Sequence, residues 1–98
     1  MLKAEVRAVN EDEKQKNRAK KIDKLISQWR RAVQAAIQIS RKDRKLSQAA
    51  VAERMAWTPD IMGNVEKGRR EITVAEFIVL AKQMGLDPEV MFRRVLEL

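Results

Sequence analysis

The chain lacks the two residue types that most often build enzyme and metal sites. Its 98 residues include no cysteine and no histidine. Without cysteine there is neither a disulfide framework nor a thiolate metal site. Without histidine the commonest general base and metal ligand are missing. Catalysis would need lysine, serine, threonine or carboxylates gathered in a pocket, and the sequence shows no such cluster. We therefore predict that the protein is not an enzyme and binds no metal or cofactor.

Glycine and proline are also scarce, with three and two residues, and tyrosine is absent. Alanine, glutamate, lysine, arginine, leucine, glutamine and methionine dominate, so we predict an all-α fold. The length allows one domain and a tail. No apolar run approaches the roughly 18 residues that span a bilayer, and the first residues lack the apolar core of a signal peptide. We expect a cytoplasmic protein with no membrane partner.

Positive charge is concentrated in the first half of the chain. Residues 1–45 contain fourteen Lys/Arg and six Asp/Glu, a net charge of +8, whereas residues 46–98 contain seven and eight, a net charge of −1. The total of +7 suggests a nucleic-acid partner. Its distribution differs from that of a simple basic recognition surface, because the basic residues precede the neutral segment.

The N-terminal part reads as a charged arm followed by a long helix. We interpret residues 1–19 as an arm that is mobile or partly helical, and residues 20–98 as the folded domain. The helix should run from near residue 19 to about Asp43. Apolar or small residues recur along it at helical spacing: Ile22, Leu25, Ile26, Trp29, Val33, Ala36, Ile37 and Ser40.

The first four residues of that stripe lie outside the part of the helix that we expect to pack in the core of the domain. Another segment must therefore bury them. They are Ile22, Leu25, Ile26 and Trp29. Two covers are possible, the C-terminal helix of the same chain or a partner chain. Tryptophan is enriched at interfaces, so we treat the four as a candidate interface.

Two short helices with a tight break are predicted between Leu46 and Arg70. Ser47 is a good N-cap for the first helix. The second begins with Thr58 as N-cap and Pro59 at the first helical position, and Gly68 ends it. This is the helix-turn-helix pattern.

Two further helices follow. Thr73 and Glu76 form a capping box for a helix that ends at Gly85, and Asp87 followed by Pro88 starts another. We expect these helices to bury Val74, Phe77, Ile78, Leu80 and Ala81 in the first, and Val90, Met91, Val95 and Leu96 in the second.

Residues 33–97 resemble the DNA-binding domain of the Xre/Cro phage-repressor family. The resemblance depends on Leu46, Ser47, Gln48, Ala52, Trp57, Thr58, Val65, Glu66, Gly68, Leu80, Ala81, Gly85 and Leu86. It implies a five-helix, phage-repressor-like helix-turn-helix fold, here with an N-terminally extended first helix. Trp57 stands at a usually aliphatic core position, so we expect it to pack rather than to stack on bases.

The resemblance also implies which residues would meet DNA. Asn64 could bind adenine, Asp60 a cytosine amino group, and Ile61 a thymine methyl. Gln48, Lys67, Arg69 and Arg70 would contact phosphates, and Thr58 lies at the start of the same helix. The family's polar pattern is broken by Pro59 and Gly63. Alternatively, residues 58–60 only start a helix and residues 67–70 are a solvated turn.

The family also pairs an acid at the position of Glu66 with an arginine at the end of the first helix, which here is Arg41. We predict an Arg41–Glu66 bridge between these helices, and the alternative is that Glu66 faces water.

The function implied is a transcriptional regulator of bacterial or phage origin, and more specifically a repressor. It would bind a palindromic operator in double-stranded DNA as a homodimer. Two alternatives remain. One is a helix-turn-helix domain that binds protein and has lost specific DNA contact. The other is the antitoxin of a toxin–antitoxin pair, in which the charged arm would fold onto a toxin.

Overall fold

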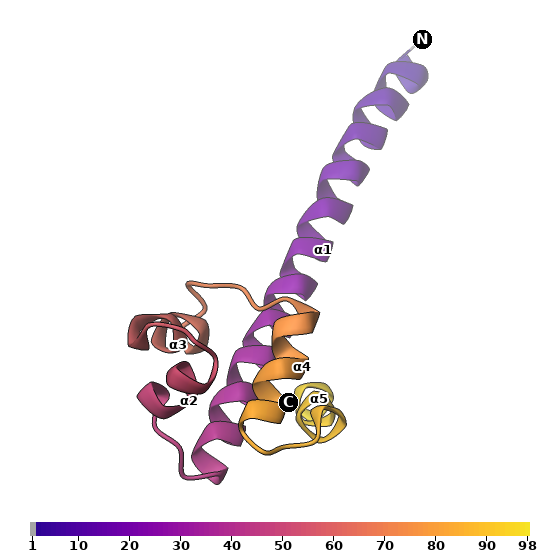
Figure 1. Cartoon of the computed structure of the whole chain (residues 1–98). Coiled ribbons are helices and arrows are strands. Elements are labelled where there is room, and N and C mark those ends of the chain that lie inside the picture. Colours follow the sequence, from indigo (N-terminus) through magenta and orange to yellow (C-terminus); the bar gives the residue numbers. More distant parts are fainter. Residues whose placement is uncertain (1) are drawn as a thin grey trace.

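The first helix is much longer than the others, and the other helices pack against one end of it. The computed structural model describes the backbone of residues 2–98 and the side chains of residues 11–98, and in it helix α1 spans Leu2–Asp43 (Figure 1). Its end at Asp43 is as predicted, but its start lies well before residue 19. No glycine or proline precedes Pro59, and Glu11 and Lys14 pair one turn apart at 4.0 Å, so nothing local stops the helix earlier. The proposed division between an arm and a domain at residues 19 and 20 remains a prediction.

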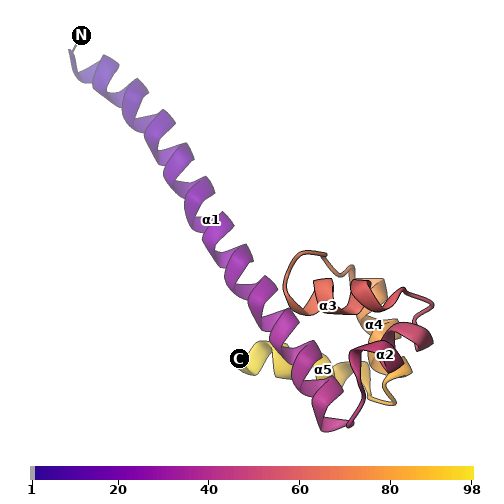
Figure 2. The ribbon, with the colours of Figure 1, turned by 90° about the vertical axis from the view of Figure 1, so that its left-hand side faces the viewer.

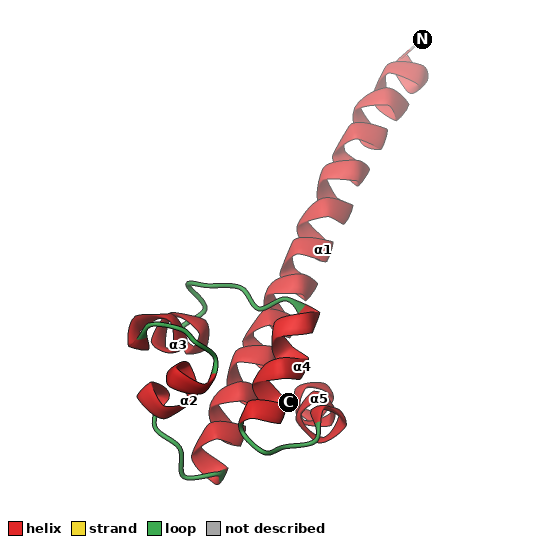
Figure 3. Ribbon diagram, in the orientation of Figure 1, coloured by secondary structure: helices red, strands yellow, loops and turns green. Residues whose placement is uncertain are grey.

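The other four helices gather around the C-terminal half of α1, and we call them the body. They are α2 (Gln48–Arg54), α3 (Pro59–Glu66), α4 (Val74–Gln83) and α5 (Pro88–Glu97). Figures 1 and 2 show the N-terminal half of α1 projecting away from the body, and Figure 3 shows only loops between the helices. The radius of gyration of 19.2 Å exceeds the ~13 Å typical of a compact chain of this length because of that projection.

Local capping chemistry sets the helix starts, as the sequence predicts. Ser47 accepts a hydrogen bond from the Ala50 amide, and Thr73 and Glu76 form the reciprocal capping box. Asp87 accepts from the Glu89 amide before Pro88. Thr58 occupies the N-cap of α3 in an extended conformation, but its side chain makes no capping hydrogen bond. Pro59 therefore defines that start through its fixed φ.

The core lies where α1 meets the body. Ile37 of α1, Met62 of α3, Leu80 of α4 and Met91 of α5 are all fully buried. α1 packs chiefly on α5 and α3, and α2 packs on α3. The predicted all-α, five-helix architecture is confirmed.

Four residues expected in the core are instead exposed. Val74 has 79% of its surface accessible, and Ile78, Val90 and Leu96 have between 41% and 55%. α4 and α5 are apolar around much of their circumference, yet each turns only one face to the core. On α4 that face holds Phe77, Leu80 and Ala81, and on α5 it holds Met91 and Val95.

Candidate nucleic-acid interface

Helices α2 and α3 form a tight pair. The chain turns between them at Ala56, whose φ of 54° lies in the left-handed region, and the Trp57 amide donates to the Ala52 carbonyl at 2.8 Å. Trp57 then packs against the core as a half-buried residue, in agreement with a packing role. The short turn fixes the angle at which α3 leaves α2.

The outer surface of this pair holds most of the predicted DNA contacts. Thr58, Asp60, Lys67 and Arg69 are exposed, and Asn64 is half-buried. A shallow hollow of about 460 Å³ lies between the starts of α2 and α3 and is lined by Gln48, Pro59, Asp60, Gly63, Asn64 and Lys67. Gly63 contributes no side chain to this lining. The structure thus brings Gln48, Asp60, Asn64 and Lys67 to one surface.

Two of the residues predicted to contact DNA make contacts within the protein. Ile61 packs against the core, which leaves less of it for a thymine methyl. Arg70 donates to Glu76 Oε2 at 2.7 Å, and its guanidinium carbon lies 4.8 Å from the centre of the Trp57 ring. Both contacts engage Arg70 within the protein, and its contact with phosphate remains a prediction.

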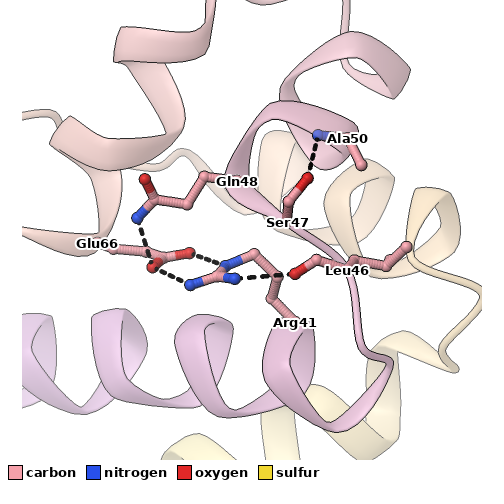
Figure 4. A network of polar contacts seen from close by, with 6 residues as sticks. All are labelled: Arg41, Leu46, Ser47, Gln48, Ala50 and Glu66. Carbon is pink, nitrogen blue, oxygen red and sulfur yellow. Dashed lines mark hydrogen bonds and ion pairs between the residues drawn. The ribbon is translucent and has the colours of Figure 1, made fainter.

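A buried ion pair ties α3 to the end of α1, as the resemblance implies (Figure 4). Arg41 Nε donates to Glu66 Oε2 at 2.6 Å, and its Nη2 donates to Oε1 at 2.9 Å. The two side chains are 10% and 2% exposed. Arg41 Nη1 also donates to the Leu46 carbonyl at 2.8 Å, which connects the loop before α2. The bidentate geometry is the strong form of such a pair.

Gln48 belongs to the same network. Its Nε2 donates to Glu66 Oε1 at 3.0 Å (Figure 4). One amide hydrogen of Gln48 is therefore engaged inside the protein and is not available to a phosphate. The network also holds the first residue of α2 against α3.

The pKa values of the pair follow from these contacts. Burial alone would raise the pKa of the Glu66 carboxyl, but hydrogen bonds from Arg41 and Gln48, with the charges of Arg41 and Lys42, outweigh it and lower that pKa. The hydrogen bond to Glu66 raises the pKa of Arg41 above its usual value. Both groups are charged at neutral pH.

The four apolar residues of the candidate interface remain uncovered. Ile22, Leu25, Ile26 and Trp29 keep 44–54% of their surface accessible. Leu98, just after α5, borders Leu25 and Trp29, but it leaves them half exposed. The C-terminal helix therefore does not provide the cover that was considered.

Several tertiary contacts had no signal in the sequence. Arg94 of α5 donates to Ser40 Oγ at 3.0 Å and pairs with Asp43 at 3.0 Å, which ties α5 to α1. Gln34 lies so close to Gly68 that a Cβ there would come within 2.5 Å of its amide nitrogen. These residues are far apart along the chain, and no local pattern marks them as partners.

Within the described residues, no helix is long and apolar enough to cross a membrane. Across that same part of the chain, no group of three acidic side chains is placed to hold a metal ion.

The fold matches known helix-turn-helix proteins. An Xre-family-like protein from Pseudomonas syringae pv. tomato superposes with a TM-score of 0.68 at 20% identity, covering 83% of this chain and 95% of its own. Two structures of the clp gene regulator ClgR from Corynebacterium glutamicum also superpose at 20% identity. One has a TM-score of 0.66 and covers 70% of this chain and 90% of its own, and the other has a TM-score of 0.65 and covers 70% and 73%. No family model and no curated protein sequence matches the chain. The chain therefore has an Xre-type helix-turn-helix fold.

Proposed function

We propose that the protein is a sequence-specific DNA-binding transcriptional regulator of the bacterial or phage cytoplasm. In this proposal it represses a promoter by binding a palindromic operator as a homodimer. The observation that supports DNA binding best is the exposed start of α3 beside the start of α2, with Gln48, Asp60, Asn64 and Lys67 around one hollow. The solved neighbours include a gene regulator with the same fold.

The recognition chemistry divides between two groups of side chains. In helix-turn-helix proteins the start of the second helix enters the major groove and the first helix crosses the backbone. Asn64 would form paired hydrogen bonds with adenine, and Asp60 would accept from cytosine. Lys67 and Arg69, just after α3, would contact phosphates and set the register without reading sequence.

The network beneath α3 supports this role. Arg41 and Glu66 fix α3 against α1, and Gln48 fixes the start of α2 against α3. A recognition helix held in place loses less conformational entropy when it binds, so more of the contact energy appears as affinity.

Selection of bound duplexes from a random pool, followed by titration at two salt concentrations, tests the proposal. A DNA-binding protein shows affinity that falls steeply with salt. We expect Asn64→Ala to cost about 1–3 kcal/mol on the selected site and to relax one base position. Lys67→Ala should weaken all sequences alike and reduce the salt slope by about one.

Arg93→Ala is the matched control, because Arg93 is exposed on α5, which packs on α1 and α4 rather than on α3. It should bind as the wild type does. Absent or salt-independent binding by the wild type would favour a protein-binding helix-turn-helix domain or an antitoxin instead.

A further inference from the structure

An apolar ridge and a groove lie side by side where α1 leaves the body. The α1 ridge consists of Ile22, Leu25, Ile26 and Trp29, each about half exposed. The α1 groove lies between the ridge and the segment 65–72, has a volume of about 520 Å³, and is lined on its inner walls by Val33, Val65 and Ile72.

We infer that a second copy of this chain covers this surface, with its α1 ridge crossing antiparallel and inserting into the α1 groove. A ridge beside a groove on one face is self-complementary, which is what a two-fold symmetric contact requires. Each copy then supplies one ridge and one groove, so the contact is made twice. The inference deepens the homodimer of the proposed function by stating where and in which direction the two copies meet.

The direction follows from what covers the rest of the stripe. Ala36, Ile37 and Ser40 continue the line of the ridge toward the C-terminal end of α1, and all three are fully buried under the body. A parallel partner would bring its own body to the same face at the same height, where the two bodies would overlap. Figure 1 shows the body at one end of α1. An antiparallel partner therefore places the two bodies at opposite ends of the contact.

Charge favours the same direction. Residues 14–21 include five Lys/Arg and no acid, whereas residues 46–98 carry a net charge of −1. Arg18 lies one turn before Ile22 on the ridge side of α1. In the antiparallel crossing it passes over the other copy's groove and away from the other copy's basic segment. Glu71, which lines that groove, is already paired with Arg30 of its own copy at 2.6 Å, so it offers Arg18 little further attraction. A parallel pairing would instead set the two basic segments against each other.

The geometry also gives a spacing. Two antiparallel helices that meet between Leu25 and Ile26 place Ile37, at the centre of each body, eleven or twelve residues from the crossing. At a rise of 1.5 Å per residue and an oblique crossing, the two bodies lie roughly 30–35 Å apart. One turn of duplex DNA, which separates half-sites in an operator, is about 34 Å. The spacing of the two bodies in this contact is therefore similar to one turn of duplex DNA.

Molar mass in solution, measured by light scattering on the full chain, tests the contact. The wild type should have twice the chain mass, and Leu25→Asp should have the mass of one chain at the same concentration. Val79→Asp is the matched control, since Val79 on α4 is 46% exposed and Leu25 is 49% exposed. It should remain a dimer. A wild type that is monomeric up to its solubility limit, or a dimeric Leu25→Asp variant with wild-type helicity, would overturn the inference.

Single cysteines test the direction, because the chain has none of its own. Under mild oxidation Ile26→Cys, at the crossing, should give a disulfide-linked dimer in high yield. Ala19→Cys should not, because antiparallel pairing places the two copies of residue 19 far apart. Efficient cross-linking at residue 19 would indicate a parallel pair and contradict the proposal.

The mass and cross-linking results do not depend on DNA. A dimer of this form that fails to bind any duplex would leave the inference intact and overturn the proposed function. A monomer that binds DNA with a salt dependence reduced by about one unit of slope in Lys67→Ala would overturn the inference and the homodimer, and would support DNA binding alone.

Discussion

The apolar stripe of α1, residues 22–40, has two halves with the same spacing and opposite surroundings. In its C-terminal half, Ala36, Ile37 and Ser40 are fully buried because the body surrounds them. In its N-terminal half, the four residues of the α1 ridge remain 44–54% exposed. The helical spacing is the same in both halves of the stripe, so periodicity alone does not distinguish them.

This difference shows what an amphipathic pattern does and does not specify. The spacing of apolar residues reports that a helix has a face to bury. It carries no information about which element buries that face. The C-terminal half obtains its cover from the same chain, and the N-terminal half is the part for which we propose a second copy.

The largest loss of stability should come from breaking the Arg41–Glu66 ion pair, which holds α3 against the C-terminal end of α1. Glu66→Ala leaves the Arg41 guanidinium, 10% exposed, without its partner, and we expect a loss of about 3–5 kcal/mol in the free energy of unfolding. Urea denaturation followed by circular dichroism measures it. Glu53→Ala, which removes an exposed acid on α2, should change stability by less than about 0.5 kcal/mol. Unchanged stability in Glu66→Ala would show that the bridge contributes nothing.

A pair of matched substitutions compares the two halves directly. Ile37→Ala, in the covered half, should cost about 2–5 kcal/mol because it opens a cavity at a fully buried site. Ile22→Ala, in the bare half and 54% exposed, should cost less than about 1 kcal/mol when measured in dilute solution. Thermal melts of both variants at low protein concentration provide the test. Equal losses would mean that the bare half is covered within the monomer.

The smallest expected effect is the change in stability with pH that Glu66 causes. The pKa of Glu66 is lowered in the folded state from its ordinary value of 4.5, so this carboxylate contributes its full stability above that value. The contribution is lost as the pH falls through the lower folded pKa, at about 1.4 kcal/mol for each unit of depression. Glu66→Gln lacks this titration.

Denaturation of the wild type and Glu66→Gln at pH 7 and pH 3 should therefore show a stability difference that shrinks on acidification. Glu76, whose pKa is also lowered by the Thr73 amide and by Arg70, gives both proteins a shared residual dependence. A difference that grows at low pH would reverse the assigned sign.

Local chemistry made much of the fold predictable. Ser47, Thr73 and Asp87 start helices because a side-chain oxygen reaches an amide two or three residues ahead, and this depends on adjacent residues alone. Gly68, at a φ of 77°, ends the α3 segment for a similarly local reason. The Arg41–Glu66 contact spans 25 residues, and only the resemblance to a known family made it foreseeable.

The differences between expectation and structure share a physical cause. The sequence predicts Val74 and Ile78 in the core because they are apolar and helical, but burial depends on which face of α4 meets its neighbours. The phosphate contact of Arg70 remains a prediction, although Arg70 already pairs with Glu76 and lies over Trp57. The helix start predicted near residue 19 is wrong, because α1 begins at Leu2 and the charged residues of its first turns give only a weak apolar pattern.

The order of residues by itself determined the helices, their caps and the helix-turn-helix pair, because these depend on contacts within a few positions along the chain. Only the tertiary structure decided which apolar faces are buried, where Arg70 points, and that Gln48 is held by Glu66. Those outcomes depend on segments brought together from distant positions, and the free energy of each contact exists only once the body has closed around α1.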